Sequence, residues 1–166
     1  MLRPSALALL LTASAASADL IARFDEGAPK DRFTITNDGA CPLPAMTVVL
    51  DLATAPAGLI FDVTGSGAGV SVYQPFELVA GAEVLRGVPE VLDGDAAIAL
   101  DLSGLGTGQS VAFTIDVDDT GGSAPTIVSG SEIAGASLRA EMGGRSVSAT
   151  FGPDAVARLG MAACLS

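Results

Sequence analysis

Apolar side chains recur at every second position along most of this chain, and this alternation limits the fold more than any other feature of the sequence. A period of two residues is typical of a strand with one buried and one solvated face, whereas a helix needs a period of 3.6. Glycine and proline separate the alternating segments, and no amphipathic stretch predicts a helix of ten or more residues. The segments predict strands near residues 20–24, 33–36, 46–52, 98–102, 111–117, 136–142, 147–151 and 156–161, with shorter strands near 59–63, 70–73, 76–79 and 126–128.

Strands of this kind bury their apolar faces by packing two antiparallel sheets face to face. We therefore expect an all-β, antiparallel β-sandwich of immunoglobulin-like general architecture, with a closed β-barrel as the second choice. Gly143-Gly144 predicts a hairpin, because a two-residue primed turn needs positive φ. The run Gly65-Ser66-Gly67-Ala68-Gly69 is interpreted as a flexible turn, because it lacks the lysine and the following helix of a phosphate-binding loop.

The first eighteen residues have the order of a secretory signal peptide. Arg3 precedes a short apolar segment at residues 6–11, and Ala16-Ser17-Ala18 has the small-x-small pattern of a cleavage site. That segment is far shorter than the roughly 20 residues of a membrane-spanning helix, although an ordinary buried helix is an alternative. We expect cleavage of residues 1–18, one domain over residues 19–166 without a membrane span, and a location in the periplasm, at the cell surface or outside the cell.

The part after the predicted cleavage site is strongly acidic. The chain has 19 acidic and 8 basic residues, and Arg3 is the only charged residue before Asp19, so residues 19–166 carry a formal net charge of −12. This charge repels nucleic acids and anionic membrane surfaces, and it favours cations. The absence of histidine excludes Ser-His-Asp and Cys-His catalysis and imidazole-bound zinc. We therefore expect a non-catalytic protein, with an enzyme of unfamiliar type as a less favoured alternative.

One acidic cluster points to a metal. Residues 116–121, Asp-Val-Asp-Asp-Thr-Gly, match the first six positions of an EF-hand calcium loop, but position twelve is Ile127 instead of glutamate. A site here would therefore need a different geometry. At a period of two, Asp116 and Asp118 share the outward face of their strand. The predicted Ca²⁺ ligands are Asp116, Asp118 and Asp119, helped by Glu26, Asp31 or Glu132. The alternative is a solvated acidic edge that prevents aggregation.

Several segments spread over most of the chain resemble one family. They are Phe24–Phe33, Gly58–Val63, Gln74–Glu77, Phe113–Asp119 and Ser131–Ala136. Together they resemble a small set of exported alphaproteobacterial proteins described as "aggregation factor core", after the calcium-dependent adhesion particles of sponges. The resemblance implies adhesion or matrix association by analogy. Residues 33–39, Phe-Thr-Ile-Thr-Asn-Asp-Gly, also resemble the second strand of many bacterial immunoglobulin-like surface domains, which supports the fold only.

These observations favour an exported, non-catalytic binding or structural module that takes part in calcium-supported adhesion or matrix association. A carbohydrate-binding module is the main alternative. Such a module needs a planar aromatic face, for which Tyr73, Phe76 and Phe151 are the candidates in a chain that has only six Phe, one Tyr and no Trp.

The two cysteines generate a first prediction, because an isolated pair in an oxidising compartment most simply forms a disulfide. A bond between Cys41 and Cys164 would close a long loop and stabilise the fold by on the order of 4–5 kcal/mol in the chain-entropy account. We expect thiol titration of the unfolded, unreduced exported protein to find no free thiol. Two free thiols would contradict the bond, and a covalent dimer would favour intermolecular pairing.

Overall fold

The computed structural model describes residues 18–70, 72–121 and 127–161, which form eleven strands and contain no helix. The strands are β1 (Ala18–Asp25), β2 (Asp31–Asn37), β3 (Met46–Asp51), β4 (Leu59–Phe61), β5 (Glu77–Ala80), β6 (Ala97–Leu102), β7 (Ser110–Ile115), β8 (Val117–Asp119), β9 (Ser137–Met142), β10 (Arg145–Thr150) and β11 (Val156–Met161).

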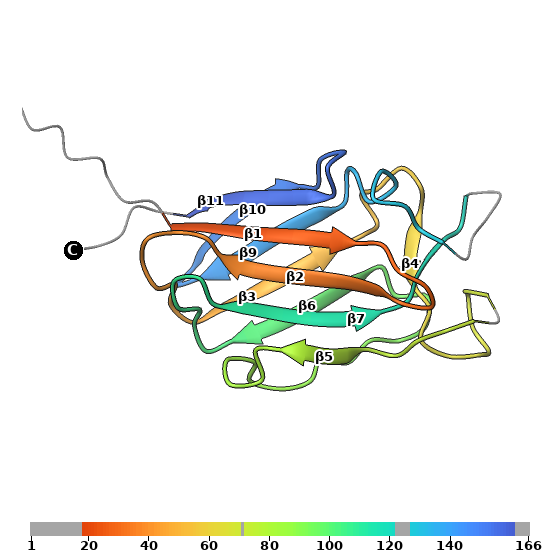
Figure 1. Cartoon of the computed structure of the whole chain (residues 1–166), viewed down its shortest axis with the longest axis horizontal. Coiled ribbons are helices and arrows are strands. Elements are labelled where there is room, and N and C mark those ends of the chain that lie inside the picture. The colour runs from red at the N-terminus through yellow and green to blue at the C-terminus, as the bar shows by residue number, and fades with distance from the viewer. Residues whose placement is uncertain (1–17, 71, 122–126, 162–166) are drawn as a thin grey trace, which may run out of the picture.

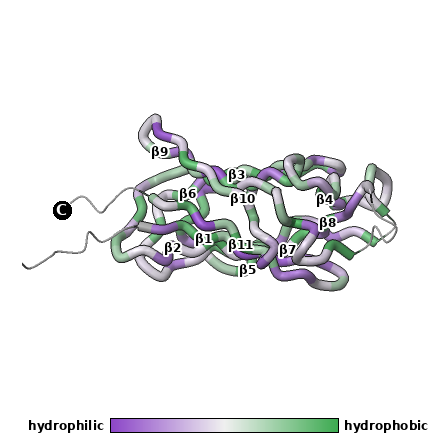
Figure 2. Tube along the Cα trace, turned by 90° about the horizontal axis from the view of Figure 1, so that it is seen from above, coloured by the Kyte–Doolittle hydropathy of each residue, from purple (hydrophilic) through white to green (hydrophobic). Residues whose placement is uncertain are grey.

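Two antiparallel sheets pack face to face, as the alternation predicts (Figure 1). One sheet has the strand order β11-β1-β2-β7-β5, and the other has the order β10-β9-β3-β6. A separate ribbon of β4 and β8 lies at the end of the sandwich away from the start of β1, and Figure 2 shows its two strands side by side. The predicted β-sandwich is confirmed, and the sheets do not close into the barrel of the alternative prediction.

A row of aromatic rings crosses the five-stranded sheet on its buried face. Phe33 on β2 pairs with Phe24 on β1 and with Phe113 on β7, and the ring centroids lie 5.1 and 5.3 Å apart. Phe76, just before β5, stacks on Phe113 at 5.0 Å. Each such pair contributes about 0.5–1.5 kcal/mol beyond the area it buries. The row therefore fixes the centre of this sheet and the segment that leads into β5.

The hairpin at Gly143-Gly144 is also confirmed. The two glycines have φ values of 53° and 78°, and they join Met142 at the end of β9 directly to Arg145 at the start of β10. The predicted strand at residues 70–73 is wrong, since residues 70, 72 and 73 form no strand. Residues 127 and 128 form none either, and residue 126 lies outside the described part of the chain.

The strand predicted over residues 111–117 divides into two. β7 ends at Ile115 in the five-stranded sheet, and β8 begins at Val117 in the ribbon. Between them, the amide of Asp116 donates to the carbonyl oxygen of Gln74 at 3.2 Å, while its own carbonyl oxygen accepts from the amide of Asp62 at 3.1 Å. At Asp116 the chain therefore changes its hydrogen-bonding partners, and this change helps to form the candidate metal site.

Two predictions concern segments that the structure describes only in part or not at all. The predicted signal peptide falls on residues 1–17 and on Ala18, which begins β1, and Cys164 lies outside the described residues. Cleavage and the Cys41–Cys164 bond therefore remain predictions. Over residues 18–70, 72–121 and 127–161, no helix has the length and apolar character needed to cross a bilayer.

Candidate metal site

The register of the β4–β8 ribbon brings acidic side chains together. Ile60 pairs with Asp118 and Phe61 with Val117, and the hydrogen bond from Asp62 to Asp116 extends this register by one pair. Side chains alternate between the faces of a strand. One face of the ribbon therefore presents Ile60, Asp62, Asp116 and Asp118, while the other presents Leu59, Phe61, Val117 and Asp119.

Asp62, Asp116 and Asp118 form a compact group, which we call the acidic triad. Each residue offers one carboxylate oxygen, and these oxygens all lie within 4.8 Å of one another. Calcium–oxygen distances are about 2.3–2.6 Å, so ligands on opposite sides of one ion are about 5 Å apart. The side chains are also shielded from solvent, with relative exposures of 0% for Asp62, 4% for Asp116 and 2% for Asp118. The acidic triad could therefore hold a metal ion.

Among the residues that the structure describes, no group donates a hydrogen bond to the carboxylate of Asp62. Both of its oxygens are buried without a partner in this part of the chain, and so is Oδ1 of Asp118. The second oxygen of Asp118, Oδ2, accepts from the amide of Val70 at 2.9 Å. A buried carboxylate without donors is costly, and proteins relieve that cost by protonation or by a bound cation. The unpartnered oxygens thus mark a place where either a proton or a cation belongs.

Burial and mutual repulsion make these carboxyls hard to ionise. Burial is the main cause that raises the pKa of Asp62 from its ordinary value of 3.8 to about 6, and the nearby carboxylates of Asp93 and Asp118 add to it. The pKa of Asp116 rises to about 7, again mainly through burial and then through the negative charge of Asp118. A cation in the acidic triad would act in the opposite direction by favouring the ionised forms.

The glycine-rich segment lies against the acidic triad. A Cβ atom on Gly69 would stand 2.2 Å from Cγ and 2.3 Å from Oδ2 of Asp62, so only glycine fits there. The following residue, Val70, donates its amide to Asp118. The sequence shows the glycines but not their purpose, which is to let a backbone approach a buried carboxylate. We call residues 63–70 the covering loop.

Asp93 fastens the covering loop at both ends. Its Oδ1 accepts from the amides of Val63 at 2.9 Å and Thr64 at 3.0 Å, and its Oδ2 accepts from the amide of Ala68 at 2.7 Å. The hydrogen bond from Val63 is the main cause that lowers the pKa of Asp93 to about 2. Asp93 is therefore an ionised acceptor for the loop backbone.

The structure separates the other predicted ligands from this group. Asp119 is buried, and the alternation along β8 places it on the other face of the ribbon. Glu26 accepts from the amide of Gly130 at 2.7 Å, and Glu132 accepts from the amide and the hydroxyl of Ser129, both at 2.7 Å. These two glutamates thus bind the backbone of residues 129–130.

Asp31 lies next to the acidic triad without joining it. Its two oxygens accept from the amides of Gly27 at 3.0 Å and Val117 at 3.2 Å. Burial nevertheless raises its pKa to about 7. Its charge acts on Asp116 and contributes to the raised pKa of that residue. Asp31 therefore adds negative potential to the site while its own oxygens are occupied.

Two sequence-based expectations need correction. The prediction that Asp116 and Asp118 face solvent is wrong, because the covering loop and Asp93 lie over this face of the ribbon. Asp62 was not among the predicted ligands. The signal available for it was an acidic residue at the end of the apolar segment 59–61, but nothing local showed that this segment pairs with residues 117–119.

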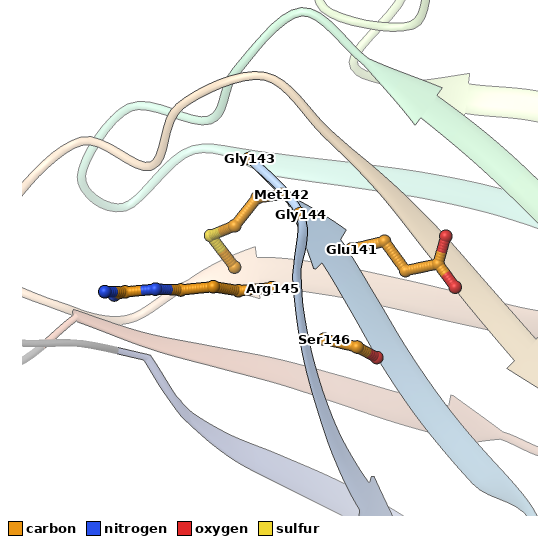
Figure 3. Close-up of a pocket in the computed structure, with 6 residues that line it drawn as sticks. All are labelled: Glu141, Met142, Gly143, Gly144, Arg145 and Ser146. Carbon is orange, nitrogen blue, oxygen red and sulfur yellow. The ribbon is translucent and has the colours of Figure 1, made fainter.

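The aromatic candidates for carbohydrate binding do not form one exposed face. Tyr73 is 43% exposed, whereas Phe151 is 2% exposed and Phe76 is stacked on Phe113. A hollow of about 320 Å³ lies at the β9–β10 hairpin. Figure 3 shows the side chains of Glu141 and Arg145 pointing away from each other there, so the charged groups do not converge.

The raised pKa values predict how stability depends on pH without metal. Between about pH 4 and pH 7, the folded protein holds protons on Asp31, Asp62 and Asp116 that the unfolded chain has lost. Stability therefore falls as pH rises through this range. We expect a lower melting temperature at pH 8 than at pH 5 in EDTA, and a smaller difference for Asp62→Asn. An equal or higher melting temperature at pH 8 would contradict the burial of ionisable carboxyls here.

Comparisons with known proteins add little to this geometry. No protein-family profile and no curated protein sequence matches the chain. Among solved structures, the chain is similar to a family GH18 chitinase from Chromobacterium violaceum, with 16% sequence identity and a TM-score of 0.36. The match covers 82% of this chain but only 19% of the chitinase chain. At this TM-score and identity, the likeness carries neither fold nor function across to this protein.

Proposed function

We propose that this protein is an exported, non-catalytic binding or structural module whose acidic triad holds a calcium ion in support of adhesion or matrix association. The observation that carries the proposal is the Asp62 carboxylate, which is buried, has no partner for either oxygen among the described residues, and lies close to two further buried carboxylates. A divalent cation would supply what these oxygens lack. It would also offset the repulsion between three negative charges within one small space.

The type of ligand favours calcium over transition metals. The acidic triad offers carboxylate oxygens only, and the chain has no histidine. Hard oxygen ligands suit calcium and magnesium, whereas zinc and copper prefer nitrogen and sulfur. The acidic chain as a whole also attracts cations.

An ion in the acidic triad would join parts of the chain that are far apart in sequence. Asp62 follows β4, Asp116 precedes β8, and Asp118 belongs to β8 and holds Val70 of the covering loop. Calcium would thus stabilise one whole end of the sandwich. A surface that calcium makes more rigid fits calcium-supported adhesion, and residues 113–119 belong to the segments that resemble aggregation factor core proteins.

A bound proton is the competing explanation of the same geometry. A protonated Asp62 would donate a hydrogen bond to Asp118 or Asp93, and no ion would then be needed. The two explanations differ in their response to calcium. A proton-sharing site gains nothing from the ion, whereas a calcium site gains stability as the ion concentration rises.

We expect millimolar calcium to raise the melting temperature at pH 7.5. A ligand at a hundredfold excess over its Kd adds about 2.7 kcal/mol of stability. Magnesium and sodium chloride at equal ionic strength should give smaller shifts, because screening alone does not need coordination. Asp62→Asn and Asp116→Asn should lose the calcium-specific shift. They should still fold, since asparagine keeps the shape and removes the repulsion.

Glu90→Gln is the matched control, because Glu90 is exposed and its replacement removes the same charge elsewhere. This variant should keep the full calcium shift. Equal shifts with all three salts, or a full calcium shift in Asp62→Asn, would contradict the proposed site.

Adhesion is tested separately with beads that carry the exported protein. We expect beads with wild-type protein to cluster in millimolar calcium and to disperse in EDTA, while beads with Asp62→Asn stay dispersed in both. Light scattering measures the clustering, and beads with Glu90→Gln are the control. Clustering that is the same with and without calcium would contradict calcium-supported self-adhesion, even where the melting experiment shows that the ion binds.

A further inference from the structure

We propose that the covering loop, residues 63–70, determines which cation the acidic triad accepts: closed over the carboxylates, it admits a cation without its water shell and so selects calcium over magnesium. This inference rests on the proposed calcium site. It assigns a role in selectivity to Gly69 and Asp93, two residues outside the acidic triad.

The covering loop packs directly against the carboxylate of Asp62. The backbone at Gly69 lies so close to Asp62 that a Cβ atom would overlap Cβ, Cγ and Oδ2 of that side chain. Asp62 has no exposed surface, so it cannot move outward without opening the loop. A metal ion bound to Asp62 would therefore be enclosed on the side of the covering loop.

A set of hydrogen bonds holds the covering loop closed. Asp93 accepts three amides at the two ends of the loop, from Val63, Thr64 and Ala68. A Cβ atom on Gly67 would stand 1.4 Å from Oδ2 of Asp93, so this position also needs glycine. The fourth bond, from Val70 to Asp118, connects the loop to a triad residue directly. The closed loop is thus fixed by carboxylate acceptors on two sides, Asp93 and Asp118.

Magnesium and calcium differ in the geometry that they require and in how readily they lose bound water. Magnesium requires near-octahedral geometry at about 2.0–2.1 Å, sheds its water slowly and usually keeps several water molecules. Calcium accepts six to eight oxygen ligands in flexible arrangements and gives up water more readily. Triad carboxylates with exposures of 0–4% leave little access for retained water. The closed loop therefore disfavours magnesium more strongly than calcium.

The experiment compares two glycine substitutions in the exported protein. Gly69→Ala places a methyl group against Asp62, whereas Gly87→Ala meets no atom within 4 Å. Neither position has the positive φ that only glycine adopts readily. Isothermal titration of each protein with calcium and with magnesium gives the two Kd values. We expect Gly69→Ala to lower the preference for calcium by at least about tenfold, and Gly87→Ala to leave it unchanged.

Substitutions of Asp93 test the same role of the loop without changing the packing at Gly69. Asp93→Ala removes all three acceptor contacts and should lower the calcium preference as Gly69→Ala does. Asp93→Asn keeps one oxygen for Val63 and Thr64 but loses the acceptor for Ala68, so it should give an intermediate preference. A role in stability alone would lower the melting temperature of these variants without changing the ratio of the two Kd values.

The outcomes separate this inference from the proposed function. A wild-type protein that binds no calcium contradicts the calcium site itself. A wild-type protein that prefers calcium, together with Gly69→Ala and Asp93→Ala proteins that keep the same preference, contradicts the role of the loop and leaves the calcium site standing. Equal affinity of the wild-type protein for both ions also overturns the inference.

Discussion

The burial of three carboxylates on one face of the β4–β8 ribbon is the constraint on which this end of the molecule depends. A face that carries Asp62, Asp116 and Asp118 cannot join the apolar core between the sheets, because buried charges need partners that aliphatic side chains do not supply. The chain therefore leaves the five-stranded sheet at Asp116 and pairs with a separate strand. The opposite face of the ribbon, with Phe61 and Val117, still packs into the core.

The same constraint explains the composition of the covering loop. A backbone that approaches a buried carboxylate needs glycine at the point of contact, and Gly67 and Gly69 stand at two such points, against Asp93 and Asp62. From sequence alone, residues 65–69 are predicted to form a flexible turn. The amides of the loop are used as donors to Asp93 and Asp118, so its glycines allow a specific set of contacts.

Sequence patterns predicted the local part of this structure and missed the non-local part. Alternation over Val111, Phe113 and Ile115 correctly indicated a strand with a buried face, and it correctly placed Asp116 and Asp118 on one side. Alternation assigns side chains to faces but does not show what covers a face, so burial of the two carboxylates was missed. An EF-hand holds its ligands within twelve consecutive residues, whereas Asp62 directly follows a strand that lies more than fifty residues before Asp116. Strand pairing over such a distance leaves no mark in the local sequence.

The aspartates of this region show how environment divides one residue type into separate roles. Asp93 receives three backbone donors, which hold its pKa near 2 and make it a permanent acceptor. Asp31 receives two donors, yet burial raises its pKa to about 7. Asp62 receives none from the described part of the chain, and it is therefore the one of the three that is a candidate to coordinate an ion. The number of hydrogen-bond donors that reach each carboxylate therefore distinguishes the structural carboxylates from the candidate metal ligand. Acidity and position in the sequence distinguish them less well.

For the exported protein that we propose, the calcium affinity that the site would need is modest. Extracellular calcium modules bind with Kd values of about 10⁻⁴–10⁻³ M, which corresponds to roughly 4–5.5 kcal/mol of binding free energy. The acidic triad would use part of its attraction for the ion to offset repulsion among its own carboxylates, a repulsion that contributes to the raised pKa of Asp116. Tight binding is therefore not expected from this geometry, even with a chain as acidic as this one. A weak site whose ligands come from separate segments would instead couple ion binding to the order of those segments. The ion would then act chiefly on the structure of the end of the sandwich that carries the covering loop.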